Sequence, residues 1–207
     1  MAEYNIYCTG SAFSVREMTG NVFISVYLRK QSQGKYLCKL VQDILPEETN
    51  PHKVRDEKLL TLMRSDLAIF LFEGSDYDSD TMADFIQAKN FDIPSVILRS
   101  DFRDSNADCF YPRTEVIQMN SKKLYSEAMN AENNVKSVLD NLYAKTAQAL
   151  IPALDKLLEA PSTLKKNHLS PEQFYESALT LVGIDRKNIP DNFIADLIQA
   201  KRDKNLL

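Results

Sequence analysis

Cysteine is scarce in this chain. Its 207 residues include three cysteines, Cys8, Cys38 and Cys109, which are odd in number and far apart. A disulfide framework needs paired cysteines, and a metal site of the Cys-x-x-Cys type needs two that are close in sequence. The sequence therefore predicts reduced, buried thiols and no metal site, and we expect no cofactor.

Long apolar runs are also lacking. No uninterrupted apolar segment approaches the roughly 20 residues that a helix needs to cross a bilayer. Near Met1 there is no basic segment followed by an apolar core, which a secretory signal would require. We therefore expect a cytoplasmic protein that does not bind membranes.

An excess of positive charge is absent as well. The formal net charge is -4 at pH 7, and no cluster of lysines and arginines alternates with aromatic side chains. Proteins that bind nucleic acid usually present such a basic surface to the phosphate backbone. Nucleic acid is therefore not an expected partner.

What is present is enough apolar material for a core, since hydrophobic residues make up 44% of the chain. Up to about residue 120, short β-prone runs alternate with helical patterns. Residues 23–30 fit either a helix or a strand, and their position between two predicted strands favours the helix. Strands are predicted at 5–9, 35–45, 67–72, 95–98 and 116–119.

The pattern becomes helical beyond residue 120. Pro152 interrupts a long apolar stripe and predicts a kinked or split helix. Ser170 is the expected cap of a following helix that stops at Gly183, and Asp191 is the expected cap of the last helix. We expect this tail to pack on the main domain or on a second subunit.

These patterns predict the fold class and the domains. Residues 1–120 are expected to form an α/β domain, a Rossmann-like or flavodoxin-like parallel sheet flanked by helices. Residues 121–207 are expected to form an α-helical C-terminal extension.

The junction between the third strand and its helix is the candidate site. Residues 67–72 form a nearly unbroken apolar run, which suits the buried middle of a parallel sheet. The next segment, 73–80, carries four carboxylates and leads into a helix over 81–90. Ser79 or Asp80 is the expected N-cap of that helix.

Periodicity alone gives Asp84 an ordinary role. The predicted apolar stripe of the helix consists of Met82, Phe85 and Ile86, and Asp84 falls on the opposite side. On this interpretation Asp84 is an exposed acid near a helix N-terminus, stabilised by the helix dipole.

Asp56 breaks the pattern of the preceding helix, which is expected to begin at Pro51 with Asn50 as its cap. It lies three, four and seven positions before apolar residues, so the spacing places it on the buried face. A buried carboxylate needs a partner or a function, because burying it unpaired is costly. Arg55 or Lys58 would serve as a structural partner, and both interpretations stay open.

Ligands of open α/β sheets bind beyond the carboxyl ends of the strands. The end of the first strand brings Tyr7, Gly10, Ser11 and Phe13 to that position, although the same residues also fit a plain strand-to-helix turn.

Three segments in this order resemble the nucleoside 2-deoxyribosyltransferase family. Residues 5–11 look like its opening strand and tyrosine-containing turn, and Arg55-Asp56 with the helix that follows looks like its Asp-bearing helix. Most specific is Asp78-Ser-Asp-Thr-Met-Ala-Asp84, which is similar to the family's Asp-Ser-Gly-Thr-x-x-Glu. The resemblance covers the first 120 or so residues.

The resemblance implies an enzyme that cleaves the N-glycosidic bond of a nucleoside or nucleotide. Asp84 matches the nucleophile that attacks the anomeric carbon, and Asp56 matches the acid on the base side. Asp78 matches a ligand of a sugar hydroxyl, and Tyr7 matches the residue that orients the nucleophile. Such chemistry needs a carboxylate to trap an oxocarbenium-like centre and an acid to protonate the leaving group. The family also completes its sites across subunits, which implies a homo-oligomer.

Two residues differ from the family pattern at this site. Asp84, the implied nucleophile, stands where the family has Glu, and Asp80 stands where it has Gly. Asp78, Ser79 and Asp80 belong to the implied substrate-binding segment. The sequence therefore leaves two functions open, an enzyme of deoxyribosyl transfer or hydrolysis and a catalytically silent module that binds a nucleoside or nucleotide. Arg99 and Arg103 are either ligands of a substrate phosphate or ordinary surface arginines.

Overall fold

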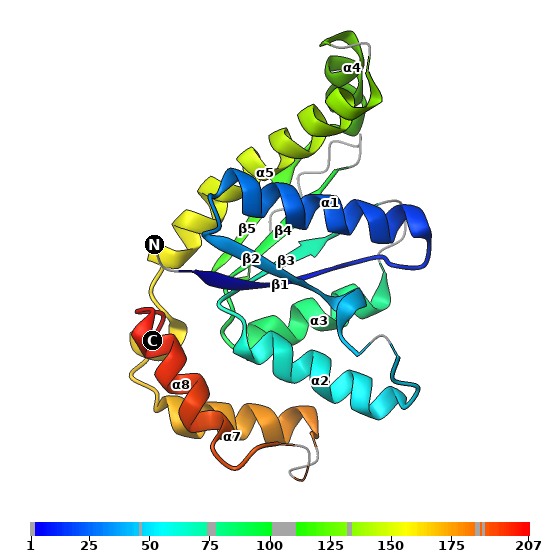
Figure 1. Ribbon diagram of the computed structural model, residues 1–207. Coiled ribbons are helices and arrows are strands. Elements are labelled where there is room, and N and C mark those ends of the chain that lie inside the picture. Colours follow the sequence, from blue (N-terminus) through cyan, green and yellow to red (C-terminus); the bar gives the residue numbers. More distant parts are fainter. Residues whose placement is uncertain are drawn as a thin grey trace.

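The computed structural model describes residues 3–45, 47–73, 78–100, 111–131, 134–184, 187 and 189–207. Five parallel strands form one sheet in the order β2-β1-β3-β4-β5 (Figure 1). The strands are β1 Tyr4–Gly10, β2 Tyr36–Leu40, β3 Leu67–Leu71, β4 Ser95–Arg99 and β5 Thr114–Gln118. The predicted α/β class with a parallel sheet is confirmed.

The strand order reverses direction between β1 and β3. The chain moves from β1 outward to β2, then returns across β1 to β3 and continues outward through β4 and β5. In open α/β sheets the crevice at such a reversal is the usual ligand position. The carboxyl ends of β1 and β3 are therefore the part of the fold where a site is expected.

Helices cover both faces of the sheet (Figure 1). α1 and α5 lie on one face, while α2 and α3 lie on the other face together with the C-terminal helices α7 and α8. The helices are α1 Val15–Gln31, α2 Pro51–Arg64, α3 Ser79–Asn90, α4 Ser121–Ala131, α5 Val135–Glu159, α6 Thr163–Lys166, α7 Pro171–Val182 and α8 Phe193–Asp203, with a 3-10 turn, η1, at Val41–Asp43.

The central strand β3 is apolar at every position because both of its faces are buried. Every residue of β3 is buried, with Ala68 and Phe70 in the core under α2 and α3. Leu67, Ile69 and Leu71 lie in the core under α1 and α5. A strand covered on both faces needs apolar side chains at every position rather than at alternate ones.

Several predicted boundaries are corrected. The helix expected at 23–30 begins earlier, at Val15, and β2 ends at Leu40 before the 3-10 turn. α5 is not split at Pro152, because the helix runs unbroken on both sides and buries Leu150 and Leu154 on the sheet. Burial of these side chains offsets the backbone hydrogen bond that a proline removes.

The helix caps are corrected in two places. α3 begins at Ser79, and Asp78 is its N-cap in place of Ser79 or Asp80. α8 is preceded by Asn192 instead of the expected Asp191, and no side chain caps it by a hydrogen bond. The expected caps Asn50, Ser170 and Gly183 are confirmed, since the first two accept backbone N–H bonds and Gly183 adopts the left-handed conformation.

The C-terminal helices pack on the main domain rather than away from it. The buried Lys201 ammonium donates to the Ser65 carbonyl at 2.8 Å, and Lys204 pairs with Asp66 at 2.6 Å. These contacts attach α8 to the segment that leads into β3. Within the described part of the chain, no helix has the length and apolar character of a membrane span.

Candidate functional site

Tyr7 and Asp84 meet at the centre of the site. Tyr7 lies in β1 with no exposed surface, and its hydroxyl donates a hydrogen bond of 2.7 Å to Asp84 Oδ2 on α3. The two residues are 77 positions apart in sequence, so the bond links the sheet to the helix that begins beyond β3. Asp84 is not the exposed acid that periodicity predicts, because α3 turns Thr81, Asp84, Phe85 and Ala88 toward the sheet.

Burial raises the pKa of Asp84 above its ordinary value, and the negative charges of Asp80 and Asp78 act in the same direction. The Tyr7 hydrogen bond and the positive charge of Lys58 oppose this effect. Burial and the neighbouring Asp84 also raise the pKa of Tyr7 well above its usual range, so the phenol stays protonated and remains a donor. The pair is therefore a carboxylate held in one orientation by a neutral phenol.

Asp78 fixes the start of α3. Its carboxylate accepts bonds from the backbone N–H groups of Asp80 and Thr81 and from the Thr81 hydroxyl, the last two at 2.9 and 2.6 Å. Such a cap typically contributes about 1 kcal/mol to helix stability. Asp78 is thus engaged in the cap that holds Asp84 in place.

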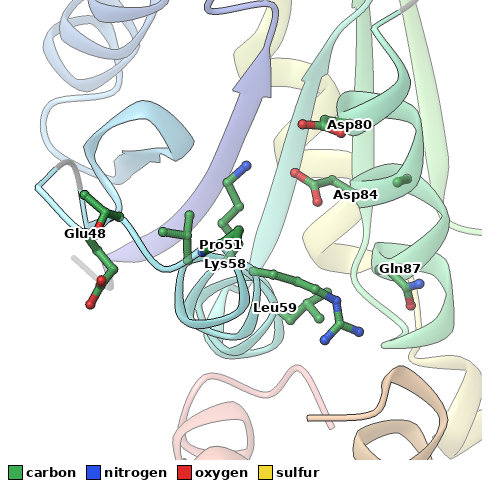
Figure 2. Close-up of a pocket in the computed structure, with 11 residues that line it drawn as sticks. Glu48, Pro51, Lys58, Leu59, Asp80, Asp84 and Gln87 are labelled. Carbon is green, nitrogen blue, oxygen red and sulfur yellow. The ribbon is translucent and has the colours of Figure 1, made fainter.

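A cavity of about 630 Å³ lies between α2 and α3. Each helix contributes one face with the spacing i, i+3, i+4, i+7 that brings side chains to the same side. Figure 2 shows Asp80 and Asp84 pointing from α3 toward α2. It also shows Lys58 extending from α2 into the space between the two helices. The two faces consist of Pro51, Val54, Arg55, Lys58 and Leu59 on α2 and of Asp80, Ala83, Asp84 and Gln87 on α3.

Asp56 is buried as its spacing predicts, with 7% of its surface exposed. Its Oδ1 accepts a bond of 3.0 Å from Arg55 Nη1, and Arg55 Nη2 also bonds to the Val182 carbonyl at the end of α7. Asp56 is not among the residues that line the cavity. Its role as the acid on the base side stays a prediction.

The residues at the end of β1 have distinct local roles. A Cβ on Gly10 would lie 2.7 Å from the Leu71 Cβ on β3, so only glycine fits this close approach of the two strands. The Ser11 hydroxyl, which precedes α1, donates a hydrogen bond of 2.7 Å to Glu17 in the first turn of that helix, and Phe13 is 82% exposed. None of these three lines the cavity, nor does the exposed Ser79.

The sequence reasoning missed part of the cavity wall. The sequence predicts for Lys58 only a structural pairing with Asp56 and predicts no role for Gln87, yet both line the cavity. The spacing could have indicated that Lys58 shares a face with Arg55, because the two lie three positions apart on α2, on a face different from that of Asp56.

The remaining residues that the sequence analysis singles out do not line the cavity or are not described. Arg99 is buried at the end of β4, with 6% of its surface exposed, and is not a surface arginine; it does not line the cavity. Arg103, Cys109 and residues 74–77 of the acidic loop lie outside the described residues. Among the residues that are described, no group of three histidine, cysteine or acidic side chains is arranged to hold a metal ion.

No protein-family model matches this chain, and no curated protein sequence is detectably similar to it. Solved structures that are similar include the CMP N-glycosidase BcmB of Clostridium botulinum, with 10% identity and a TM-score of 0.41 over 62% of this chain and 99% of that one. A conserved protein of Enterococcus faecalis V583 has 21% identity and a TM-score of 0.49 over 75% of this chain and 99% of its own. An oxidoreductase of Corynebacterium diphtheriae has 11% identity and a TM-score of 0.44 with the same coverage. At these identities and scores, the similarities carry no inference about the reaction or the substrate of this chain.

Proposed function

We propose that this protein cleaves the N-glycosidic bond of a nucleoside or nucleotide, with Asp84 as the nucleophile. The observation that carries the proposal is the bond of 2.7 Å from the Tyr7 hydroxyl to Asp84 Oδ2, beside a cavity of about 630 Å³. Tyr7 occupies one carboxylate oxygen, which leaves Oδ1 as the attacking atom. A cavity of this volume is within the range of about 300–1,000 Å³ that is usual for small-molecule sites.

The chemistry requires an oriented carboxylate close to a bound sugar. Attack of Asp84 on the anomeric carbon would form a glycosyl ester as the bond to the base breaks. Transfer of the sugar to a second base or to water would then free the carboxylate. The location of Asp84 beyond the carboxyl end of β3, next to the strand reversal, is where the fold favours a ligand.

The second candidate is a binding module of the same fold that does not cleave the bond. Burial raises the pKa of Asp84, and Asp80 adds a second acid to the same cavity wall. Both effects reduce the fraction of Asp84 that is ionised and ready to attack. Asp is also one methylene shorter than Glu, which limits its reach, and a misplacement of about 1 Å can cost roughly a hundredfold in rate.

Self-association is part of the proposal. The outer face of α1 exposes Val15, Val22 and Val26 in series, with Phe13 just before the helix. An exposed apolar stripe of this kind commonly marks a protein interface. Light scattering of the purified protein would show an oligomer, and a strictly monomeric protein would remove this part of the proposal.

Product analysis separates the two candidate functions. The protein is incubated with 2'-deoxyinosine or 2'-deoxycytidine, with their 5'-phosphates, and with deoxyinosine plus adenine, and the products are separated by chromatography. Free base from one substrate alone indicates hydrolysis, and a new nucleoside in the mixture indicates transfer. If none of these substrates releases base, the enzyme proposal fails, and binding measured by calorimetry would then support the second candidate.

A further inference from the structure

We propose that Lys58 is the acid on the base side of the reaction, the group that donates a proton to the departing base. This inference rests on the proposed function and names the residue that completes it. The ammonium extends from α2 into the same cavity into which Asp84 points from α3 (Figure 2).

Lys58 is the available cation on this wall. Arg55 also lines the cavity, but its guanidinium is engaged by Asp56 and by the Val182 carbonyl. In the part of the chain that the structure describes, the Lys58 ammonium makes no hydrogen bond. It is close enough for its charge to act on the Asp84 carboxyl, yet it forms no ion pair of 4 Å or less with a described carboxylate. A cation in this position is free to donate to a ligand.

The competing residue, Asp56, lies on another face of the same helix. It is buried, does not line the cavity, and accepts a hydrogen bond from Arg55. A general acid must come within hydrogen-bond reach of the atom that it protonates, about 2.6–3.2 Å. Lys58 lines the cavity in which a ligand would bind, whereas Asp56 does not line it.

Asp84 forms a bond to C1' while the bond from C1' to the base nitrogen breaks, and the electron pair of that bond passes to the base. Lys58 gives one proton to the base and becomes a neutral amine. When water or a second base attacks C1', the amine takes the proton of the attacking group, and both the ammonium and the Asp84 carboxylate are restored.

The test uses two leaving groups. A 2'-deoxynucleoside needs protonation of its base, whereas 4-nitrophenyl 2-deoxyriboside releases a phenolate that does not. Wild type is compared with Lys58→Met, with Lys58→Arg, which keeps the charge but does not release a proton, and with Lys30→Met. Lys30 is an exposed lysine at the end of α1 on the opposite face of the sheet, which makes it a matched control.

We expect Lys58→Met and Lys58→Arg to lose about 10²- to 10⁴-fold in turnover of the nucleoside, the usual contribution of a general acid. Turnover of the aryl deoxyriboside should fall by a few-fold at most, and added methylamine should partly restore Lys58→Met on the nucleoside. Equal losses on both substrates, or full nucleoside turnover by either variant, would overturn the assignment. If wild type cleaves neither substrate nor any 5'-phosphate, the proposed function itself fails, which is a distinguishable result.

Discussion

Removing the Tyr7 hydroxyl tests how the site prepares Asp84. In Tyr7→Phe the ring still fills its buried position, but the bond of 2.7 Å to Asp84 Oδ2 is lost. Hydrogen bonds to charged groups contribute about 1.5–3 kcal/mol. Since this bond favours the ionised, oriented carboxylate, its loss reduces the population ready to attack by about 10- to 150-fold, at about 1.4 kcal/mol per factor of ten.

The pH dependence identifies the cause of the loss. The Tyr7 bond lowers the pKa of Asp84, so its removal moves that pKa further upward. The acid limb of kcat/KM should therefore shift to higher pH in Tyr7→Phe, and the deficit should shrink at pH values where Asp84 is fully ionised. Base release is measured by chromatography across a pH series.

Tyr36→Phe is the matched control. Tyr36 is also fully buried, lies in the neighbouring strand β2, and donates its hydroxyl to the carboxylate of Asp155, away from the cavity. This variant should lose stability without a change in the pH profile. An unshifted profile in Tyr7→Phe, or the same shift in both variants, would refute the reasoning about Asp84.

Three further predictions concern stability, each measured by urea unfolding. Gly10→Ala should destabilise the protein by about 1–3 kcal/mol because its Cβ would meet Leu71 at 2.7 Å. Gly20→Ala inside α1, where the nearest atom to the added Cβ is 3.7 Å away, should stabilise the protein by about 0.5–1 kcal/mol. Changes of the opposite sign would contradict the account of the β1–β3 contact. Burial holds the pKa of Asp84 above its unfolded value of about 3.9, so between the unfolded and folded pKa values the folded state binds more protons, and stability falls as the pH rises through that window. Asp84→Asn should therefore be more stable than wild type at pH 7 and not below about pH 4. A variant that is less stable at pH 7 would argue against a buried charge. Burial lowers the pKa of Lys201 to about 8, below the unfolded value of about 10.4, so stability should rise between these pH values in wild type and not in Lys201→Met; parallel pH curves would show that Lys201 is not the cause.

The fold was predictable because each element carries a local signal. β3 is apolar at every position because it is covered on both faces, and Asn50, Ser170 and Gly183 are residues that suit helix ends for local hydrogen-bonding or conformational reasons. The split expected at Pro152 does not occur, because the cost of a proline is local while the burial that offsets it comes from the sheet. Propensity does not include that tertiary contribution.

The site was only partly predictable. The motifs that resemble the family single out Asp84 and Tyr7, which the structure joins by a hydrogen bond. Helical periodicity alone predicts an exposed Asp84, because Met82, Phe85 and Ile86 define an apolar stripe on the opposite side of the helix. The position of Asp84 depends on Tyr7, which is 77 residues away, and on α2 facing α3 across the cavity. That Lys58 lines the cavity could not be predicted, because only the packing of α2 against α3 decides which face of α2 borders it.

The most direct test of the central claim is a search for a sugar ester on Asp84. The protein is mixed with a 2'-deoxynucleoside, quenched in acid, and analysed by intact-mass and peptide mass spectrometry, with Asp84→Ala as the control. We predict a mass increase of one deoxyribosyl group in wild type, located on the peptide that contains Asp84, and none in the variant. Base release that persists in Asp84→Ala, or an adduct on any other residue, would contradict the assignment of Asp84 as the nucleophile.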